Sequence, residues 1–297
     1  KSPFNDLEWK LIIWYSPSIF FGPLIWKMKR SAGCKTYLIL RDIFPEWALD
    51  LGLIRKGVTY AFFKLIANFQ YSTADTIGVQ TKSNLTYLTD WANRPQRNLQ
   101  VLQNWQTPRK NIGSSINVTN TSLAGRKIFA YIGNMGIAQG MDIFIDLAEK
   151  LNNNEDLGFL FVGRGSEVLR LKACIKELAL SNILFFDEVD PQEMPGLLEQ
   201  CHIGLLALDP RHTTHNIPGK FLTYLLASLP LLARVNAGTD LAHLIEEEGL
   251  GKVYVGDSVV ELIALAEEII YNQKSYENMA SRGQKLAKKM FSSKIWV

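Results

Sequence analysis

Two glycine-rich segments carry residue types that suit the binding of a phosphate group. The first reads YIGNMGIAQG over residues 131–140, between a predicted strand and a predicted helix. Glycine lets the backbone approach a ligand closely, and the first amides of a helix, expected here from Gly140 onward, attract anions. The second segment, at the end of the next predicted strand, contains Gly163-Arg164-Gly165 and adds a cation. The alternative is that these glycines only close strand-to-helix turns.

The glycine spacing argues against one familiar class of enzyme. The first segment reads G-x-x-G-x-x-x-G instead of the G-x-G-x-x-G of dinucleotide-binding proteins, and no acidic residue ends the following strand. Because that carboxylate binds the ribose of the dinucleotide, an NAD-dependent dehydrogenase is disfavoured.

A third segment, residues 209–224, reads DPRHTTHNIPGKFLTY and gathers basic residues before a predicted helix. Pro218 suits a helix start, so the amides of Gly219 and Lys220 are expected to face outward at the positive end of that helix. A zinc site from His212 and His215 lacks a third ligand at a convincing spacing. The segment therefore predicts a binding site for a diphosphate.

Charged residues also follow the predicted strand Thr36–Leu40, where the sequence reads RDIFPE. The carboxyl end of a buried parallel strand points into the crevice in which open α/β sheets bind ligands. Arg41, Asp42 and Glu46 are therefore candidates to face a bound ligand. A purely structural salt bridge is the alternative.

The elements that must position these residues alternate between strands and helices along nearly the whole chain. This pattern predicts an α/β fold with parallel, doubly wound sheets. We expect a first domain over residues 1–105 with four strands, a polar linker over 106–125, and a second domain over 126–278 with six strands. Residues 279–297 are predicted to form a basic helix that crosses back to the first domain.

Composition and charge fit a globular chain whose two parts differ. The 297 residues are 47% hydrophobic, and three cysteines fit neither a disulfide framework nor a metal site. Residues 1–125 hold 15 Lys and Arg against 7 Asp and Glu, together with six of the seven tryptophans. This mixture favours an anionic membrane surface over nucleic acid as a partner. A basic surface with buried tryptophans is the alternative.

One apolar stretch, from Leu11 to Trp26, is too short to span a membrane. It offers about 16 residues, broken by two prolines, where a spanning helix needs about 20. The helix predicted within Ile19–Lys29 has two interpretations: it lies against lipid headgroups through Ile19, Phe20, Leu24, Ile25 and Trp26, or it packs on its own sheet.

Together these motifs resemble those of family 4 glycosyltransferases, which have the GT-B fold. The resemblance rests on GNMG at 133–136, VGRG at 162–165, DEV at 187–189 and PGKFLTYLLASLPLL at 218–232. In the first part it rests on YSP at 15–17, RDIFPE at 41–46, residues 74–80 and residues 102–105. The run from 215 to 221 is most similar to WbuB-like transferases of O-antigen and capsule assembly.

The resemblance implies two Rossmann-like domains that face a cleft, here with an incomplete first domain. It implies that the donor diphosphate and its sugar contact Gly133, Asn134, Gly136, Gln139, Gly140, Arg164, Pro218, Gly219 and Lys220. The donor base would lie at Glu188 and Val189. His215 and Thr223 stand where many members have two glutamates, one contacting the sugar and one the ribose, so His215 is one of the catalytic candidates. On the acceptor side, the resemblance implies Asp42, with Glu46 behind it, as the catalytic carboxylate nearest the acceptor hydroxyl, or Arg41 as the group that holds the acceptor phosphate.

The implied function is retaining transfer of an amino sugar without a metal or a cofactor. The expected donor is UDP-linked N-acetyl-L-fucosamine, and the expected acceptor is a polyprenyl-diphosphate-linked saccharide of O-antigen or capsule biosynthesis. The enzyme would be cytoplasmic and peripheral on the inner face of the bacterial membrane. A GT-B sugar-nucleotide epimerase and a non-catalytic nucleotide-sugar binding protein are the alternatives.

The length of the chain carries one more expectation. GT-B enzymes run to roughly 400 residues, and this chain has 297 and no initiating methionine. We therefore expect an amino-terminal truncation of about 100 residues, with donor binding surviving better than transfer.

Overall fold

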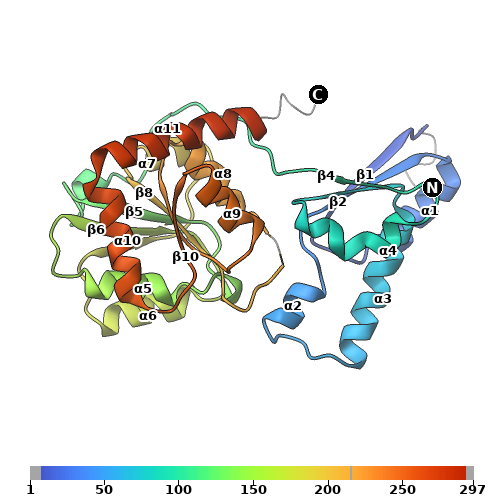
Figure 1. Ribbon diagram of the computed structural model, residues 1–297, viewed down its shortest axis with the longest axis horizontal. Coiled ribbons are helices and arrows are strands. Elements are labelled where there is room, and N and C mark those ends of the chain that lie inside the picture. Colours follow the sequence, from blue (N-terminus) through green and yellow to red (C-terminus); the bar gives the residue numbers. More distant parts are fainter. Residues whose placement is uncertain (1–7, 215, 292–297) are drawn as a thin grey trace. The chain divides into compact units, whose positions relative to one another are not determined.

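The computed structural model describes residues 8–214 and 216–291, which form two compact units (Figure 1). Unit 1 comprises residues 1–103 together with 211–217. Unit 2 comprises residues 104–210 and 218–297. The prediction for His215 and part of the prediction for residues 279–297 therefore lie outside the described residues.

Unit 1 contains a parallel sheet of four strands in sequence order: β1 (Leu11–Ser16), β2 (Lys35–Leu40), β3 (Thr76–Val79) and β4 (Asn98–Val101). The connecting helices are α1 (Gly22–Ala32), α2 (Glu46–Asp50), α3 (Val58–Thr73), the 3₁₀ turn η1 (Ser83–Leu88) and α4 (Thr89–Ala92). Side chains of β1 alternate between buried and exposed, because only one face of this strand packs into the core of unit 1.

Three details of unit 1 differ from or refine the predictions. The apolar pair Val101–Leu102, followed by Asn104-Trp105, predicts the fourth strand at those residues, whereas β4 ends at Val101 and pairs with β3 from Asn98 opposite Thr76 to Val101 opposite Val79. A 3₁₀ turn and a single helical turn replace the helix expected after Ser83. Helix α1 packs on the sheet and α3, with Ile19 and Ile25 in the core instead of at a surface.

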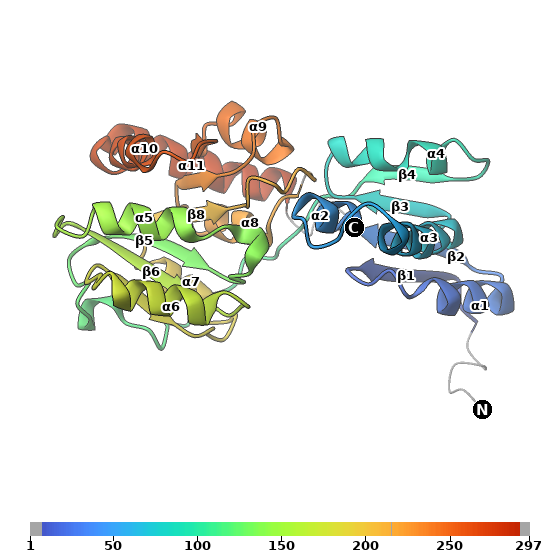
Figure 2. The same ribbon diagram turned by 90° about the horizontal axis from the view of Figure 1, so that it is seen from below.

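Unit 2 contains all six strands predicted for the second half of the chain, in one parallel sheet of order β10-β9-β8-β5-β6-β7. The strands are β5 (Lys127–Ile132), β6 (Leu157–Val162), β7 (Ile183–Phe186), β8 (Ile203–Ala207), β9 (Leu231–Arg234) and β10 (Gly251–Tyr254). The helices are α5 (Asp142–Lys150), α6 (Val168–Glu177), α7 (Met194–Leu198), α8 (Gly219–Leu226), α9 (Asp240–Glu247), α10 (Val259–Tyr271) and α11 (Gln273–Met290), and two 3₁₀ turns are η2 (Val118–Asn120) and η3 (Ile137–Gln139). Figure 2 shows the sheet from a second direction.

The core of unit 2 is continuous across the sheet. All six residues of β6 are buried, as expected for a parallel strand that is covered on both faces. Helix α11 packs on α8, and Phe291 beyond its end meets Phe221 edge to face at 6.0 Å. The predicted crossing of residues 279–297 to the first domain stays a prediction, because residues 292–297 lie outside the described part of the chain.

Strand order reverses between β5 and β8, which are neighbours in the sheet although three connections separate them in sequence. In open α/β sheets, ligands bind outside the carboxyl ends of the strands at such a switch point. The loop after β5 is the first glycine-rich segment, and Lys220 lies on the helix that follows β8. The fold of unit 2 therefore places both segments at the position where a ligand is expected.

Candidate functional site

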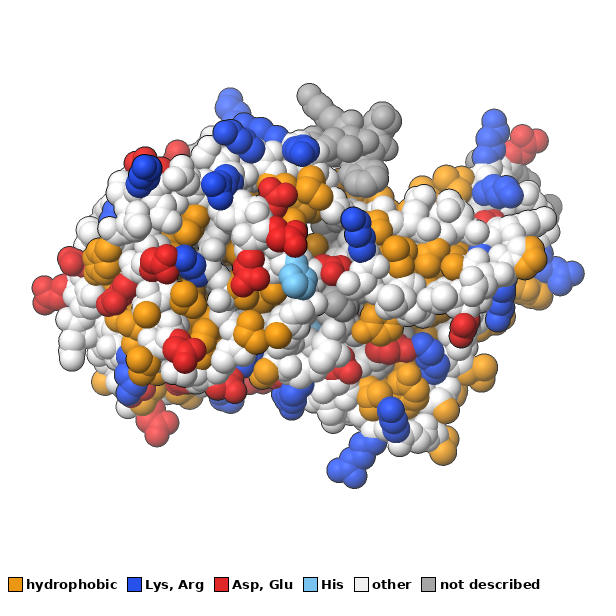
Figure 3. Space-filling model, in the orientation of Figure 1, with side chains coloured by type: hydrophobic (Ala, Val, Ile, Leu, Met, Phe, Trp, Pro, Cys, Tyr) orange, Lys and Arg blue, Asp and Glu red, His pale blue; other side chains and the backbone are white. Residues whose placement is uncertain are grey.

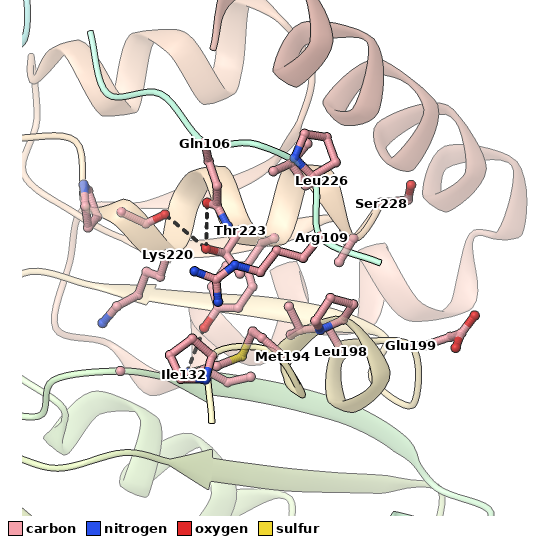
Figure 4. Close-up of a pocket in the computed structure, with 18 of the residues that line it drawn as sticks. Gln106, Arg109, Ile132, Met194, Leu198, Glu199, Lys220, Thr223, Leu226 and Ser228 are labelled. Atoms are coloured by element: carbon pink, nitrogen blue, oxygen red, sulfur yellow. Dashed lines mark hydrogen bonds between the residues drawn. The ribbon is translucent and has the colours of Figure 1, made fainter. Parts of the chain in front are cut away.

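A cavity of about 710 Å³ opens at this end of unit 2 (Figure 4). Its lining comes from four parts of the unit: the residues before β5, the loop after β5, helix α7 and helix α8. Of the candidate donor residues, Gly133, Asn134, Gln139, Pro218, Gly219, Lys220 and Thr223 line it. The structure thus brings together seven residues from two segments that lie far apart in the sequence.

Lys220 carries the main electrostatic feature of the cavity. Its ammonium lies 3.7 Å from the centre of the Tyr131 ring and donates to the Tyr131 hydroxyl, which in turn donates to the carbonyl of Asn134 at 2.8 Å. Burial lowers the pKa of Lys220 to about 7. Among the described residues no carboxylate pairs with this ammonium. An anionic ligand would supply the missing negative charge.

Helix α8 presents its first turn to the same cavity. Pro218 is the N-cap residue, with extended backbone angles, and no side chain of the described residues makes a capping hydrogen bond there. Gly219 and Lys220, the first two helical residues, line the cavity. The positive end of a helix attracts anions, and so α8 adds to the effect of the Lys220 charge.

Two side chains that the sequence analysis did not select also line this cavity. Gln106 accepts a hydrogen bond from the Thr223 hydroxyl at 3.1 Å, and the guanidinium of Arg109 reaches across the cavity in Figure 4. Both belong to the segment that was predicted as a linker. Its polar composition gives no sign of this role, because the position of an irregular segment depends on packing far along the chain.

The glycines of the two loops have a packing role that the sequence only partly indicated. A Cβ atom on Gly163 would lie 2.0 Å from the Gly133 carbonyl oxygen, and one on Gly165 would lie 2.1 Å from the Met135 carbonyl oxygen. Both have φ near +150°, a conformation that other residues rarely adopt. The glycines after β6 therefore let its loop pack directly on the backbone of the loop after β5.

Replacing Gly165 with alanine is therefore expected to destabilise unit 2 by about 2–4 kcal/mol, because backbone strain adds to the overlap with Met135. Thermal or urea unfolding measures this change. Gly238→Ala is the matched control: its φ is +69° and nothing lies within 4 Å of the added Cβ, so only about 1 kcal/mol is expected. Equal losses for the two variants would contradict the packing role.

Gly136 and Gly140 differ from the expected picture of amides facing a ligand. The amide of Gly136 donates to the Gln139 side chain at 2.8 Å, and that of Gly140 donates to the Ile137 carbonyl at 3.2 Å. Gly140 ends η3 in the left-handed conformation, and α5 begins only at Asp142. These two amides therefore shape the loop in this structure.

Arg164, Glu188 and Val189 are not among the residues that line the cavity. Arg164 pairs with Glu188 at 3.1 Å, and both side chains are exposed. The pair joins the ends of β6 and β7, as expected for loops at one edge of a parallel sheet. Its interaction with a donor base stays a prediction.

The acceptor candidates lie in unit 1. The Arg41 guanidinium is buried and donates to the carbonyls of Leu102 and Gln103, so it anchors the end of β4. Glu46 accepts from Lys64 and, at 3.4 Å, from Tyr60, both on α3. These contacts hold unit 1 together. Of the two candidate carboxylates, Asp42 is therefore the one that we consider for the reaction.

Asp42 sits in an environment that disfavours its charge. Burial raises the pKa of this carboxyl group, and the neighbouring His212 and Arg41 act in the opposite direction. His212, which the sequence analysis weighed only as a zinc ligand, is itself buried. It belongs to the segment 211–217, which unit 1 holds through Thr213 on Asp50 and Ile217 on Gln80. His215 lies outside the described residues.

The described part of the chain contains no group of three or more His, Cys, Asp or Glu side chains that could hold a metal ion. The zinc site considered from the sequence includes His215, which lies outside the described residues. Metal independence of the reaction stays a prediction.

The two parallel-sheet units and the cavity at a switch point define a protein of the GT-B fold. The crystal structure of Anabaena HepE in complex with UDP-glucose matches 94% of this chain and 74% of that chain, with a TM-score of 0.73 and 16% identity. S. aureus TarM, in a complex that includes UDP, matches 95% of this chain and 53% of its own, with a TM-score of 0.68 and 13% identity.

Sequence comparison then gives the family. The profile described as "Glycosyl transferases group 1" matches residues 119–286, and the chain belongs to this family. It is 26% identical over 250 residues to "Probable glycosyltransferase WbjE" of Pseudomonas aeruginosa, covering 82% of this chain and 61% of that protein. It is 26% identical to Escherichia coli WcaI, whose name assigns it provisionally to colanic acid biosynthesis, covering 86% and 66%. The chain thus spans less than two thirds of either relative.

Proposed function

We propose that this chain binds a UDP-sugar in the unit 2 cavity and transfers the sugar, with retention and without a metal or cofactor, to an acceptor. The observation that carries the proposal is the half-buried Lys220 ammonium, which lines the cavity at the switch point beside the start of α8 and has no carboxylate among the described residues to balance it. The family, and neighbours such as HepE in complex with UDP-glucose, support the same class of ligand.

The chemistry follows from the charges around the cavity. Lys220, Arg109 and the first amides of α8 would hold the diphosphate. Because negative charge grows on the departing diphosphate as the sugar bond breaks, groups fixed in this position stabilise the transition state more than the ground state. Thr223 and Gln106 offer hydroxyl and amide groups to the ribose, and Met194 and Leu198 provide an apolar wall.

We propose N-acetyl-L-fucosamine as the transferred sugar and a polyprenyl-diphosphate-linked saccharide as the acceptor, in O-antigen or capsule assembly. Support comes from the WbuB-like run of residues 215–221, and the provisional assignment of WcaI to colanic acid biosynthesis points to polysaccharide assembly. Such an acceptor is anchored in lipid, so the chain would work as a peripheral protein on an anionic membrane, at the cytoplasmic face. None of the helices in the described residues is long and apolar enough to cross a membrane.

The test is a calorimetric titration of the full chain with UDP, UDP-GlcNAc and UDP-N-acetyl-L-fucosamine, followed by product analysis with lipid-extracted acceptor. Binding of all three, with transfer from the last, supports the proposal. Interconversion of sugar nucleotides without acceptor would identify an epimerase instead. Binding without turnover would identify a nucleotide-sugar binding protein, and absence of UDP binding would refute the donor site.

A further inference from the structure

Helix α3 has an apolar stripe on its outer side. Val58, Phe62, Leu65 and Phe69 are 88%, 55%, 69% and 41% exposed. Their spacing of four, three and four residues places them on one face of the helix. Soluble proteins rarely expose so many large apolar side chains in one row, and such a row marks an interaction surface.

The stripe continues onto α1. The Phe69 ring lies against Gly22, and the Phe21 amide donates to Gln70 on α3 at 3.2 Å. Phe20 and Phe21, just before α1, and Leu24 and Trp26 on it are all exposed. The two helices therefore share one exposed apolar surface, defined here by Phe20, Phe21, Leu24, Trp26, Val58, Phe62, Leu65 and Phe69.

The charged residues within these two helices are all basic, and two of them pair with acidic neighbours: Lys29 with Asp75 and Lys64 with Glu46. Neither α1 nor α3 contains an Asp or Glu residue. Lys27 and Arg30 are exposed on α1, with Arg30 5.1 Å above the Trp26 ring, and Arg55 and Lys56 are exposed just before α3. Figure 3 shows hydrophobic side chains interspersed with Lys and Arg, and with some Asp or Glu, over the part of the surface that carries α3. Apolar side chains among cations are complementary to anionic lipid headgroups above an acyl layer.

We propose that α1 and α3 form the surface through which this chain docks on an anionic lipid bilayer. This assignment rests on the proposed function in one respect, because the proposed acceptor is anchored in lipid and must be reached at a membrane surface. Phe63 of α3 meets Phe44 at 5.3 Å, and Lys64 pairs with Glu46, so the middle of α3 packs on the segment that contains Asp42. A bilayer under α3 would present the acceptor at that segment.

The test uses vesicles of equal parts phosphatidylglycerol and phosphatidylcholine, with pure phosphatidylcholine as reference. The full chain is expected to sediment with the anionic vesicles. The double variant Phe62→Ser/Leu65→Ser is expected to lose at least about tenfold in partitioning, because two apolar anchors are removed. Lys27→Glu/Arg30→Glu is expected to abolish the preference for anionic vesicles. Leu169→Ser/Val260→Ser, two side chains on α6 and α10 that are 83% and 71% exposed, is the control and should bind normally.

Three results would overturn the assignment: no binding of the unchanged protein to anionic vesicles, normal binding of the Phe62/Leu65 variant, or a lipid-independent dimer that the same variant abolishes without vesicle binding. Titration of each sample with UDP separates the two proposals. Normal UDP binding without vesicle binding refutes only the docking surface, whereas vesicle binding without UDP binding refutes only the donor site.

Discussion

Replacing Lys220 with methionine is expected to weaken UDP binding by about 10- to 100-fold, which corresponds to the loss of one charge-assisted hydrogen bond. Methionine keeps much of the apolar length of the side chain, so the packing on Tyr131 changes little. Calorimetry at pH 7 measures the change. Lys176→Met removes an exposed lysine from α6 of the same unit and should leave the affinity unaltered. Equal affinities of the Lys220 variant and the unchanged protein would refute its role.

The pH dependence provides a second readout of the same residue. Burial lowers the pKa of Lys220 to about 7 in the free protein, and a bound diphosphate favours the charged form and raises this pKa again. Binding above pH 7 therefore takes up a proton, and affinity should fall by up to about tenfold per pH unit. The methionine variant should lose this dependence. Titration in buffers with different ionisation enthalpies measures the proton uptake directly.

The stability of the free protein should change with pH in the opposite direction. The unfolded lysine has a pKa near its ordinary value of about 10.4, well above the folded value. Between the two values the unfolded state binds the extra proton, so the contribution of Lys220 to the free energy of unfolding rises with pH across this range. Below the folded value, both states are protonated and the contribution is constant.

Replacing Asp42 with asparagine is expected to reduce sugar transfer by about 10²- to 10⁴-fold, the range for loss of a group that accepts a proton in the reaction. The amide keeps the shape of the side chain and cannot accept that proton. UDP affinity should not change, because the donor residues all lie in unit 2. Asp90→Asn, at an exposed position on α4, is the control. Transfer of labelled sugar to lipid-extracted acceptor is the assay.

His212 gives this prediction a sharper form. Its charge lowers the pKa of Asp42 against the effect of burial, so His212→Gln should raise that pKa further. The acidic limb of the pH–rate profile should then move to higher pH, while the maximal rate changes less. A variant with an unmoved limb and normal folding would show that Asp42 does not set the profile.

The sequence predicted the sheets of the molecule well, because alternating buried strands and helices leave a regular signature. It also located the loops at 133–140 and 163–166 and the helix that begins at Gly219. It missed Arg109 and Gln106, since a polar segment without periodicity does not reveal which cavity it borders. It also left the packing of Gly163 and Gly165 on neighbouring backbone out of account, because contacts between loops of adjacent strands depend on exact register.

Local patterns were least informative where distant parts of the chain meet. Strand β4 lies earlier in the sequence than the apolar pair Val101–Leu102 indicates, because its pairing with β3 decides its position more than its own weak apolar content does. His212 was considered with His215 because they are close in sequence, whereas the structure puts His212 beside Asp42. Both outcomes depend on long-range contacts that a single sequence does not display.

The attachment of residues 211–217 to unit 1 has a consequence for any attempt to divide the chain. Gln80 exchanges two hydrogen bonds with Ile217 across 137 residues of sequence. An expression fragment that starts at residue 104 would contain the whole donor cavity but would leave this segment without Gln80 and Asp50. On the ribosome, likewise, the sheet of unit 1 emerges long before residues 211–217, which complete the unit. To express either unit alone, residues 211–217 should therefore be kept with unit 1 and left out of unit 2.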